Sequence, residues 1–141
     1  SRMRIFGESE SDARYTVRLE RYIKDIDIEV EALKNLVSGH VLPAAYRQLA
    51  LLAQAGTGRA IKSGLERMDA SVDALTTRVV DLQAAAERAA GEHEHEARAR
   101  VLADEVVPAM ASVREVCDRI EESVADEFWT LPKYREMLSL I

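Results

Sequence analysis

A regular ladder of apolar residues between positions 61 and 89 constrains this chain more than any other feature of its sequence. Successive members stand alternately four and three residues apart, so they form one stripe along the side of a long α-helix. A helix with such a stripe gains most of its stability by packing the stripe against other helices. The ladder therefore predicts a helical bundle. Its members are Ile61, Leu65, Met68, Val72, Leu75, Val79, Leu82, Ala86 and Ala89.

Two further stretches show the same periodicity. Proline removes one backbone hydrogen bond from a helix and crowds the preceding turn, so we expect a kink at Pro43 in the first stretch and at Pro108 in the last. The first stretch begins near Ser9 and has its stripe at Tyr15, Leu19, Tyr22, Ile26, Val30, Leu33 and Val37, resuming after Pro43 as far as Ala55. The last begins around Glu92 and has its stripe at Leu102, Val106, Ala109, Val113, Cys117, Ile120 and Val124.

Short turns separate the three predicted helices. Gly56-Thr57-Gly58 marks the first turn, and Gly91 is expected to end the second helix in a left-handed conformation. Connections this short make neighbouring helices antiparallel. We predict an all-α fold, an elongated antiparallel bundle of three long helices with a short helical segment around Tyr134 to Leu138. Residues 9–141 would form one domain, and residues 1–8 a flexible segment or the cut end of a longer chain.

The charge pattern narrows the possible partners. Lys and Arg number 19 against 25 Asp and Glu, for a formal net charge of −6, and the two signs are interleaved. Nucleic acids and anionic membranes both bind concentrated positive surfaces, so we expect neither as a partner. No apolar run approaches the roughly 20 residues that span a bilayer. The single cysteine can form no intrachain disulfide, and the expected location is the cytoplasm.

Two motifs resemble catalytic signatures but lack a part that the chemistry needs. The segment 56–63 lacks the glycine that stands before the lysine of a phosphate-binding loop, because Ile61 occupies that position and belongs to the stripe. Cys117 lies on the stripe of the last helix between Val113 and Ile120, where an apolar environment makes a thiol inert. We interpret the first as an interhelical turn and the second as a core side chain.

The sequence His93-Glu94-His95-Glu96 resembles a metal-binding cluster. Side chains two residues apart on a helix point about 200° apart, so the two imidazoles would not share an ion. Glu92 and His95 form one Glu-x-x-His pair, but a di-iron site needs two such pairs and two more carboxylates. Because Val37 stands three residues before His40, the second pair is absent. We predict a solvated helix start, and no catalytic, cofactor-binding or metal-binding residue in this chain.

The C-terminal tail is too apolar to be left in solvent. It could fold back over one end of the bundle, or it could dock onto a surface that lies outside this chain. The candidate docking residues are Phe128, Trp129, Leu131, Pro132, Tyr134 and Leu138.

Several segments, taken in order, resemble the C-terminal region of type III glutamine synthetases. The resemblance runs from about Phe6 to the end of the chain. Its most specific parts are the two Leu/Val-Pro-Ala segments, Val41–Ala45 and Asp104–Met110, and the Trp-x-x-Pro-x-Tyr motif within Asp126–Leu138.

This resemblance implies a parent protein that is a large, ring-forming cytoplasmic ligase, which amidates glutamate with ammonia in an ATP-driven reaction. ATP and Mg would be cofactors of the parent, bound by upstream catalytic regions whose motifs do not occur here. The chain would be a non-catalytic C-terminal domain with a structural, assembly or regulatory role. Its partners would be the catalytic region of its own subunit and the neighbouring subunits of a homo-oligomer. The alternative is a free-standing helical adaptor that binds a partner protein.

Overall fold

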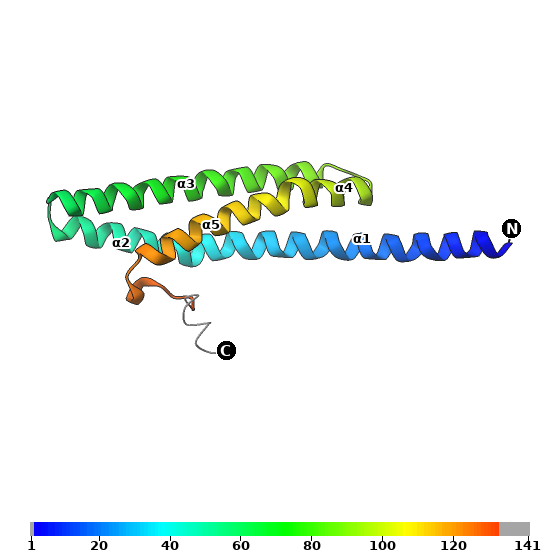
Figure 1. Cartoon of the computed structure of the whole chain (residues 1–141), viewed down its shortest axis with the longest axis horizontal. Coiled ribbons are helices and arrows are strands. Elements are labelled where there is room, and N and C mark those ends of the chain that lie inside the picture. The colour runs from blue at the N-terminus through cyan, green and yellow to red at the C-terminus, as the bar shows by residue number, and fades with distance from the viewer. Residues whose placement is uncertain (1, 133–141) are drawn as a thin grey trace.

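The computed structural model describes the backbone of residues 2–132 and the side chains of residues 11–132. All regular structure in that range is helical, which confirms the all-α class (Figure 1). The short helical segment predicted around Tyr134 to Leu138 lies outside the described residues. No described helix is long and apolar enough to cross a membrane.

Three continuous helical segments make up the described chain, with a reversal of direction between successive segments (Figure 1). The first consists of α1 (Arg2–Leu36), the π-helical turn η1 (Val37–Val41) and α2 (Leu42–Ala55). The second is α3 (Arg59–Ala90). The third consists of α4 (His95–Val101), the π-helical turn η2 (Leu102–Val106) and α5 (Val107–Ser123), and a 3₁₀ turn, η3 (Asp126–Phe128), follows it.

Two helix starts differ from the prediction. α1 begins at Arg2 and not near Ser9, because the residues ahead of Ser9 include good helix formers such as Met3 and Arg4. α4 begins at His95 and not at Glu92, since Glu94 has extended backbone angles (φ −86°, ψ 137°) and occupies the N-cap. The division of the chain into residues 1–8 and 9–141 stays a prediction.

The two helix-interior prolines do not break their helices. Where the sequence predicts kinks at Pro43 and Pro108, the structure has a π-turn immediately before each proline. Ahead of Pro43 the N–H of Leu42 donates to the carbonyl of Val37, five residues back, and the same bond precedes Pro108. Each proline then stands where the hydrogen-bonding pattern changes from π back to α. Its missing N–H therefore falls where the series of backbone hydrogen bonds is interrupted in any case.

The two interhelical turns use glycine differently. Gly56 has a φ of +140°, a backbone conformation that glycine adopts without steric cost. Gly58 is the N-cap of α3, with extended backbone angles. Gly91 has φ −73° and ψ −15°, so the predicted left-handed cap is wrong. Its N–H instead donates to the carbonyl of Glu87 at 3.0 Å and extends the right-handed helix by one step.

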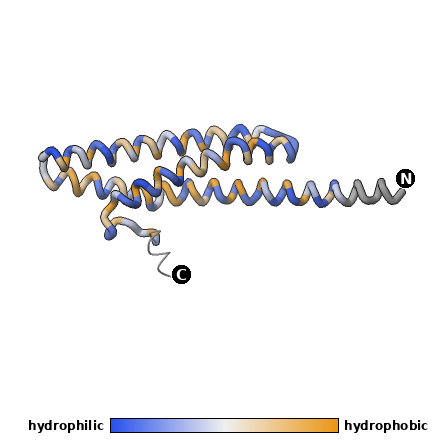
Figure 2. Tube along the Cα trace, in the orientation of Figure 1, coloured by the Kyte–Doolittle hydropathy of each residue, from blue (hydrophilic) through white to orange (hydrophobic). Residues whose placement is uncertain are grey.

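The predicted stripes meet in one core. α3 packs against α2 and α5, while α4 packs against α1. Every member of the ladder from Ile61 to Ala89 is buried or half-buried, and Leu75 and Leu82 are fully enclosed. Figure 2 shows apolar residues recurring along each helix between polar ones, as an amphipathic bundle requires.

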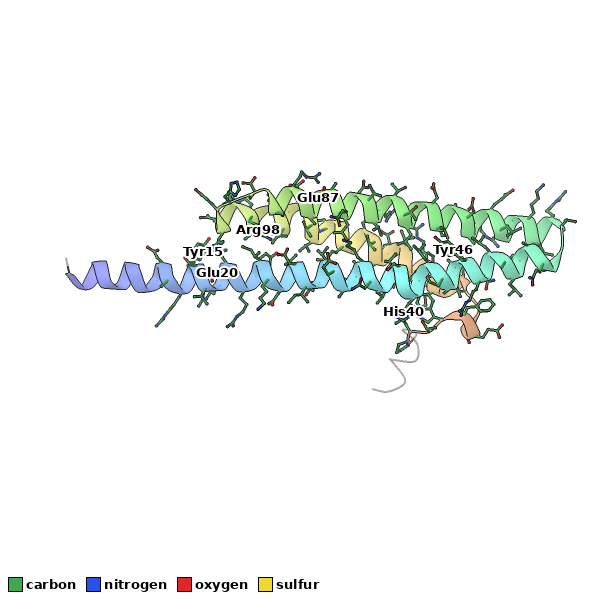
Figure 3. All side chains as sticks on the ribbon, turned by 180° about the vertical axis from the view of Figure 1, so that it is seen from behind. Tyr15, Glu20, His40, Tyr46, Glu87 and Arg98 are labelled. Carbon is green, nitrogen blue, oxygen red and sulfur yellow. The ribbon has the colours of Figure 1, made fainter. Side chains whose placement is uncertain are left out.

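Burial departs from the predicted pattern at several positions. Tyr15 and Ala55, both expected in the core, are exposed. Tyr15 lies on the part of α1 that continues past the α3–α4 turn, where no described helix faces it (Figure 3). Ala85, which lies outside the predicted ladder, is only 2% exposed, because a small side chain lets another helix approach closely.

Candidate interaction site

The described residues assemble no metal centre. No three His, Cys, Asp or Glu side chains among them lie close enough together to hold an ion. His93 and Glu94 are exposed at the α3–α4 turn, and the Nδ1 atom of His95 lies 3.7 Å from Oε1 of Glu20 across on α1. His95 therefore contacts a carboxylate of a neighbouring helix, but within the described range the cluster does not gather enough ligands to hold a metal ion.

The other two candidate motifs lie where the sequence places them. Segment 56–63 is the turn between α2 and α3, preceded by a helix and not by a strand. Cys117 is 8% exposed, and burial raises the pKa of its thiol to about 11. At neutral pH this thiol is protonated, and a protonated buried thiol is a poor nucleophile.

The beginning of the tail folds back against the bundle. Phe128 and Trp129 are half-buried and pack on the core, and η3 contacts α2. The N–H of Ala125 donates to Oε1 of Gln48 at 3.0 Å. His40 Nδ1 and Thr130 Oγ1 form a second hydrogen bond of 2.6 Å, and Figure 3 labels His40 where the tail approaches η1.

The candidate docking residues thus fall into three groups. Phe128 and Trp129 pack on the core, and Leu131 is half-buried. Pro132 is exposed. Tyr134 and Leu138 lie outside the described residues, so docking of the tail onto another surface stays a prediction. The indole Nε1–H of Trp129 is buried without a hydrogen-bond acceptor in the described part of the chain, which leaves one donor for a further contact.

The N-terminal part of α1 is the most exposed helical surface that the structure describes. It projects past the α3–α4 turn (Figure 1), and every residue from 11 to 18 is exposed. Sequence reasoning placed Tyr15 of this part in the core. The relative length of the helices could have indicated its exposure. The first segment runs from Arg2 to Ala55 and α3 only from Arg59 to Ala90, so α3 is too short to cover all of the first segment.

Two polar contacts join α4 to the part of α1 that follows the projecting end. Nη2 of Arg98 on α4 donates to Oδ2 of Asp27 on α1 at 2.9 Å. Figure 3 labels Arg98 on α4 and Glu20 on the facing part of α1. The contact between His95 and Glu20 lies on the same side, and the four residues line a groove of about 530 Å³ between the two helices. Since both pairs are partly solvated, each adds little to the stability of the fold.

Both the family comparison and the comparison with individual proteins match this chain to glutamine synthetases. Residues 1–59 match the family described as the glutamine synthetase C-terminal domain. The chain is 30% identical to a glutamine synthetase of Bacteroides fragilis (strain YCH46), in an alignment that covers 96% of the chain and 20% of that protein. It is 29% identical to a type-3 glutamine synthetase of Dictyostelium discoideum, with coverages of 98% and 22%. The chain thus spans about a fifth of the length of these curated relatives.

Proposed function

Since the chain carries the C-terminal domain of the glutamine synthetase family, as its sequence predicts, we propose that it is a non-catalytic part of a larger glutamine synthetase. The parent would form glutamine from glutamate and ammonia with ATP in the cytoplasm. The role of this domain is structural: it supports assembly of the parent or its regulation.

The observation that carries this proposal is the chemistry of the interior. All described residues of the buried core are apolar side chains, from Ile23 on α1 to Val124 after α5, and its one nucleophile is the protonated thiol of Cys117. General acid–base catalysis needs a titratable group beside a place where substrate can bind. The charged side chains of the described residues lie on the surface or in partly open grooves, where solvent screens them.

ATP and Mg²⁺, which the parent reaction would use, do not fit the described residues. Mg²⁺ takes carboxylates together with nucleotide phosphates, and no group of acidic side chains in the described range could hold an ion. The turn at 56–58 has no lysine placed to reach phosphates after a glycine-rich loop. Upstream regions of the parent would supply these sites.

We further propose that the three helical segments act in the parent as one elongated antiparallel bundle. Its partners are the catalytic region of the same subunit and the neighbouring subunits of a homo-oligomer. The exposed α1 surface, with Tyr15 49% exposed, supports this, because apolar and aromatic side chains on a protruding helix are typical of contact surfaces.

Deletion of the domain tests the proposal. Full-length parent and a form that ends where this chain begins are compared by sedimentation and by glutamine formation, and the isolated 141-residue chain is assayed alongside. We expect the shortened form to lose assembly, and the isolated chain to form no glutamine. Turnover by the isolated chain would contradict the proposal, as would a shortened enzyme that assembles and reacts like the full-length one. A gene whose reading frame starts at Met3 would favour the free-standing adaptor.

A further inference from the structure

A groove of about 600 Å³ lies where the C-terminal end of α5 meets α2 and α3. α3 packs against both of the other helices (Figure 1), and all three contribute side chains to the groove. Its volume falls within the range of about 300–1,000 Å³ that is usual for binding pockets. We call it the arginine groove. Its lining includes Gln48 and Leu52 of α2, Arg67 and Met68 of α3, and Arg119 and Glu122 of α5.

The two arginines of the groove are exposed, and neither forms an ion pair with a described residue. The residues three and four positions from Arg67 along α3 are Ser, Gly or Ala, so its own helix offers it no carboxylate. Glu115 stands four residues before Arg119 but instead contacts Arg78, at 3.4 Å. The groove therefore presents two guanidinium groups, from two different helices, whose charges a partner can pair.

The other lining residues add a neutral donor, one carboxylate and an apolar surface. Oε1 of Gln48 accepts a hydrogen bond from the N–H of Ala125 at 3.0 Å, and no described residue accepts from its Nε2. Glu122 has no ion pair within the described range. Met68 is buried and Leu52 half-buried. With two arginines and one glutamate, the groove is net positive in a chain whose formal charge is −6.

We propose that the arginine groove binds an acidic polypeptide segment of the parent, with carboxylates of that segment paired to Arg67 and Arg119. Guanidinium groups bind carboxylates through two parallel hydrogen bonds. Glu122 would repel a compact polyanion such as phosphate, whereas a polypeptide can hold its carboxylates apart from Glu122 and lay an apolar side chain on Leu52. Arg and Met are also enriched where proteins contact one another.

This inference rests on the proposed function, whose partners are the catalytic region of the same subunit and the neighbouring subunits. It names the surface and the chemistry by which one of them is bound. Because the arginines are exposed, each ion pair is weak, and the contact depends on the groups of the groove acting together.

A peptide probe tests the groove in the 141-residue chain. Fluorescence anisotropy measures binding of a dye-labelled peptide Glu-Glu-Leu-Glu and of its uncharged analogue Gln-Gln-Leu-Gln. We expect the acidic peptide to bind at least roughly tenfold more tightly, and an equal concentration of inorganic phosphate to leave it bound. Failure of the acidic peptide to bind would overturn the proposal. Displacement by phosphate would also overturn it, by indicating a site for small anions.

Charge reversal tests whether the two arginines are responsible. Arg67→Glu with Arg119→Glu should weaken binding of the acidic peptide at least roughly tenfold, and Arg67→Gln with Arg119→Gln should weaken it less. Far-UV circular dichroism checks that each variant folds. Arg59→Glu with Lys62→Glu is the matched control, because both residues are exposed on α3 outside the groove and the charge change is the same. Equal weakening by the control would indicate general charge attraction and overturn the proposal.

The same two pairs of substitutions extend the test to the full-length parent. Reversal of the groove arginines should weaken its assembly, measured by sedimentation, while the control pair should not. Normal assembly with both groove arginines reversed would overturn the proposal. That result would leave the structural role of the domain untouched, because deletion of the domain measures that role separately.

Discussion

Leu75 lies at the middle of the ladder that predicts the bundle, and its replacement by alanine tests that prediction most directly. It is 0% exposed on α3, and α3 packs against both α2 and α5. Leu75→Ala removes three carbon atoms from this enclosed position. At about 0.8 kcal/mol for each buried methylene, the lost transfer free energy is about 2.4 kcal/mol.

The cavity left behind adds to this cost. Surrounding helices collapse only partly around a deleted side chain, and a site between two packed helices has little freedom to close. We therefore expect Leu75→Ala to lower the free energy of unfolding by about 3–5 kcal/mol. At about 1.4 kcal/mol per tenfold, the folding equilibrium constant falls by at least a hundredfold.

Urea unfolding, followed by far-UV circular dichroism, measures this change. The midpoint should fall while the dependence on urea concentration stays the same, because the surface exposed on unfolding hardly changes. Val80→Ala is the control, since Val80 lies on the same helix and is 67% exposed. It should change the free energy of unfolding by less than about 0.5 kcal/mol. A cost for Leu75→Ala below about 1 kcal/mol, with unchanged urea dependence, would refute the packing of the ladder described above.

Three further predictions concern Cys117, Trp129 and the histidine pair at the α3–α4 turn. Burial raises the pKa of the Cys117 thiol from 9.0 to about 11, so the folded state holds the proton more tightly. The stability that this adds is present below pH 9 and is lost as the pH rises towards 11; the difference in free energy of unfolding between wild type and Cys117→Ala should fall over that window. Trp129→Ala should accelerate amide hydrogen exchange at residues 125–131, while Glu127→Ala, an exposed neighbour, should not; equal protection in both variants would argue against the fold-back. His93→Ala combined with His95→Ala should leave the metal content, measured by elemental analysis, and the free energy of unfolding near wild type; loss of a stoichiometric metal would show that the metal site was wrongly dismissed.

Much of the fold could be predicted from periodicity, because the core is apolar and its helices are long. The ladder from Ile61 to Ala89 and the buried position of Cys117 both depend on a repeat that one sequence displays openly. The family could be predicted as well, since it rests on specific segments such as Val41–Ala45.

Local backbone geometry was less predictable. Glycine at position 91 fits a left-handed cap and an ordinary last helical turn equally well, and the sequence does not separate them. Pro43 indicates a disturbed helix but not whether the helix bends or adopts a π-turn, because both absorb the missing N–H. Exposure of Tyr15 depends on where the α3–α4 turn ends relative to α1, which is a property of the assembled helices (Figure 1).

The two π-turns have a consequence for how this fold tolerates change in chain length. A π-turn holds one residue more than an α-turn. The extra residue rotates the helix after the turn relative to the helix before it, and so decides which residues of the second helix face the core. Removing one residue between Val37 and Val41 would rotate all of α2 by about 100° around its axis. Ala44 and Ala45, which are now buried, would swing towards solvent. The first and third helical segments therefore each consist of two helices whose buried faces are set independently, and the proline marks the boundary between them.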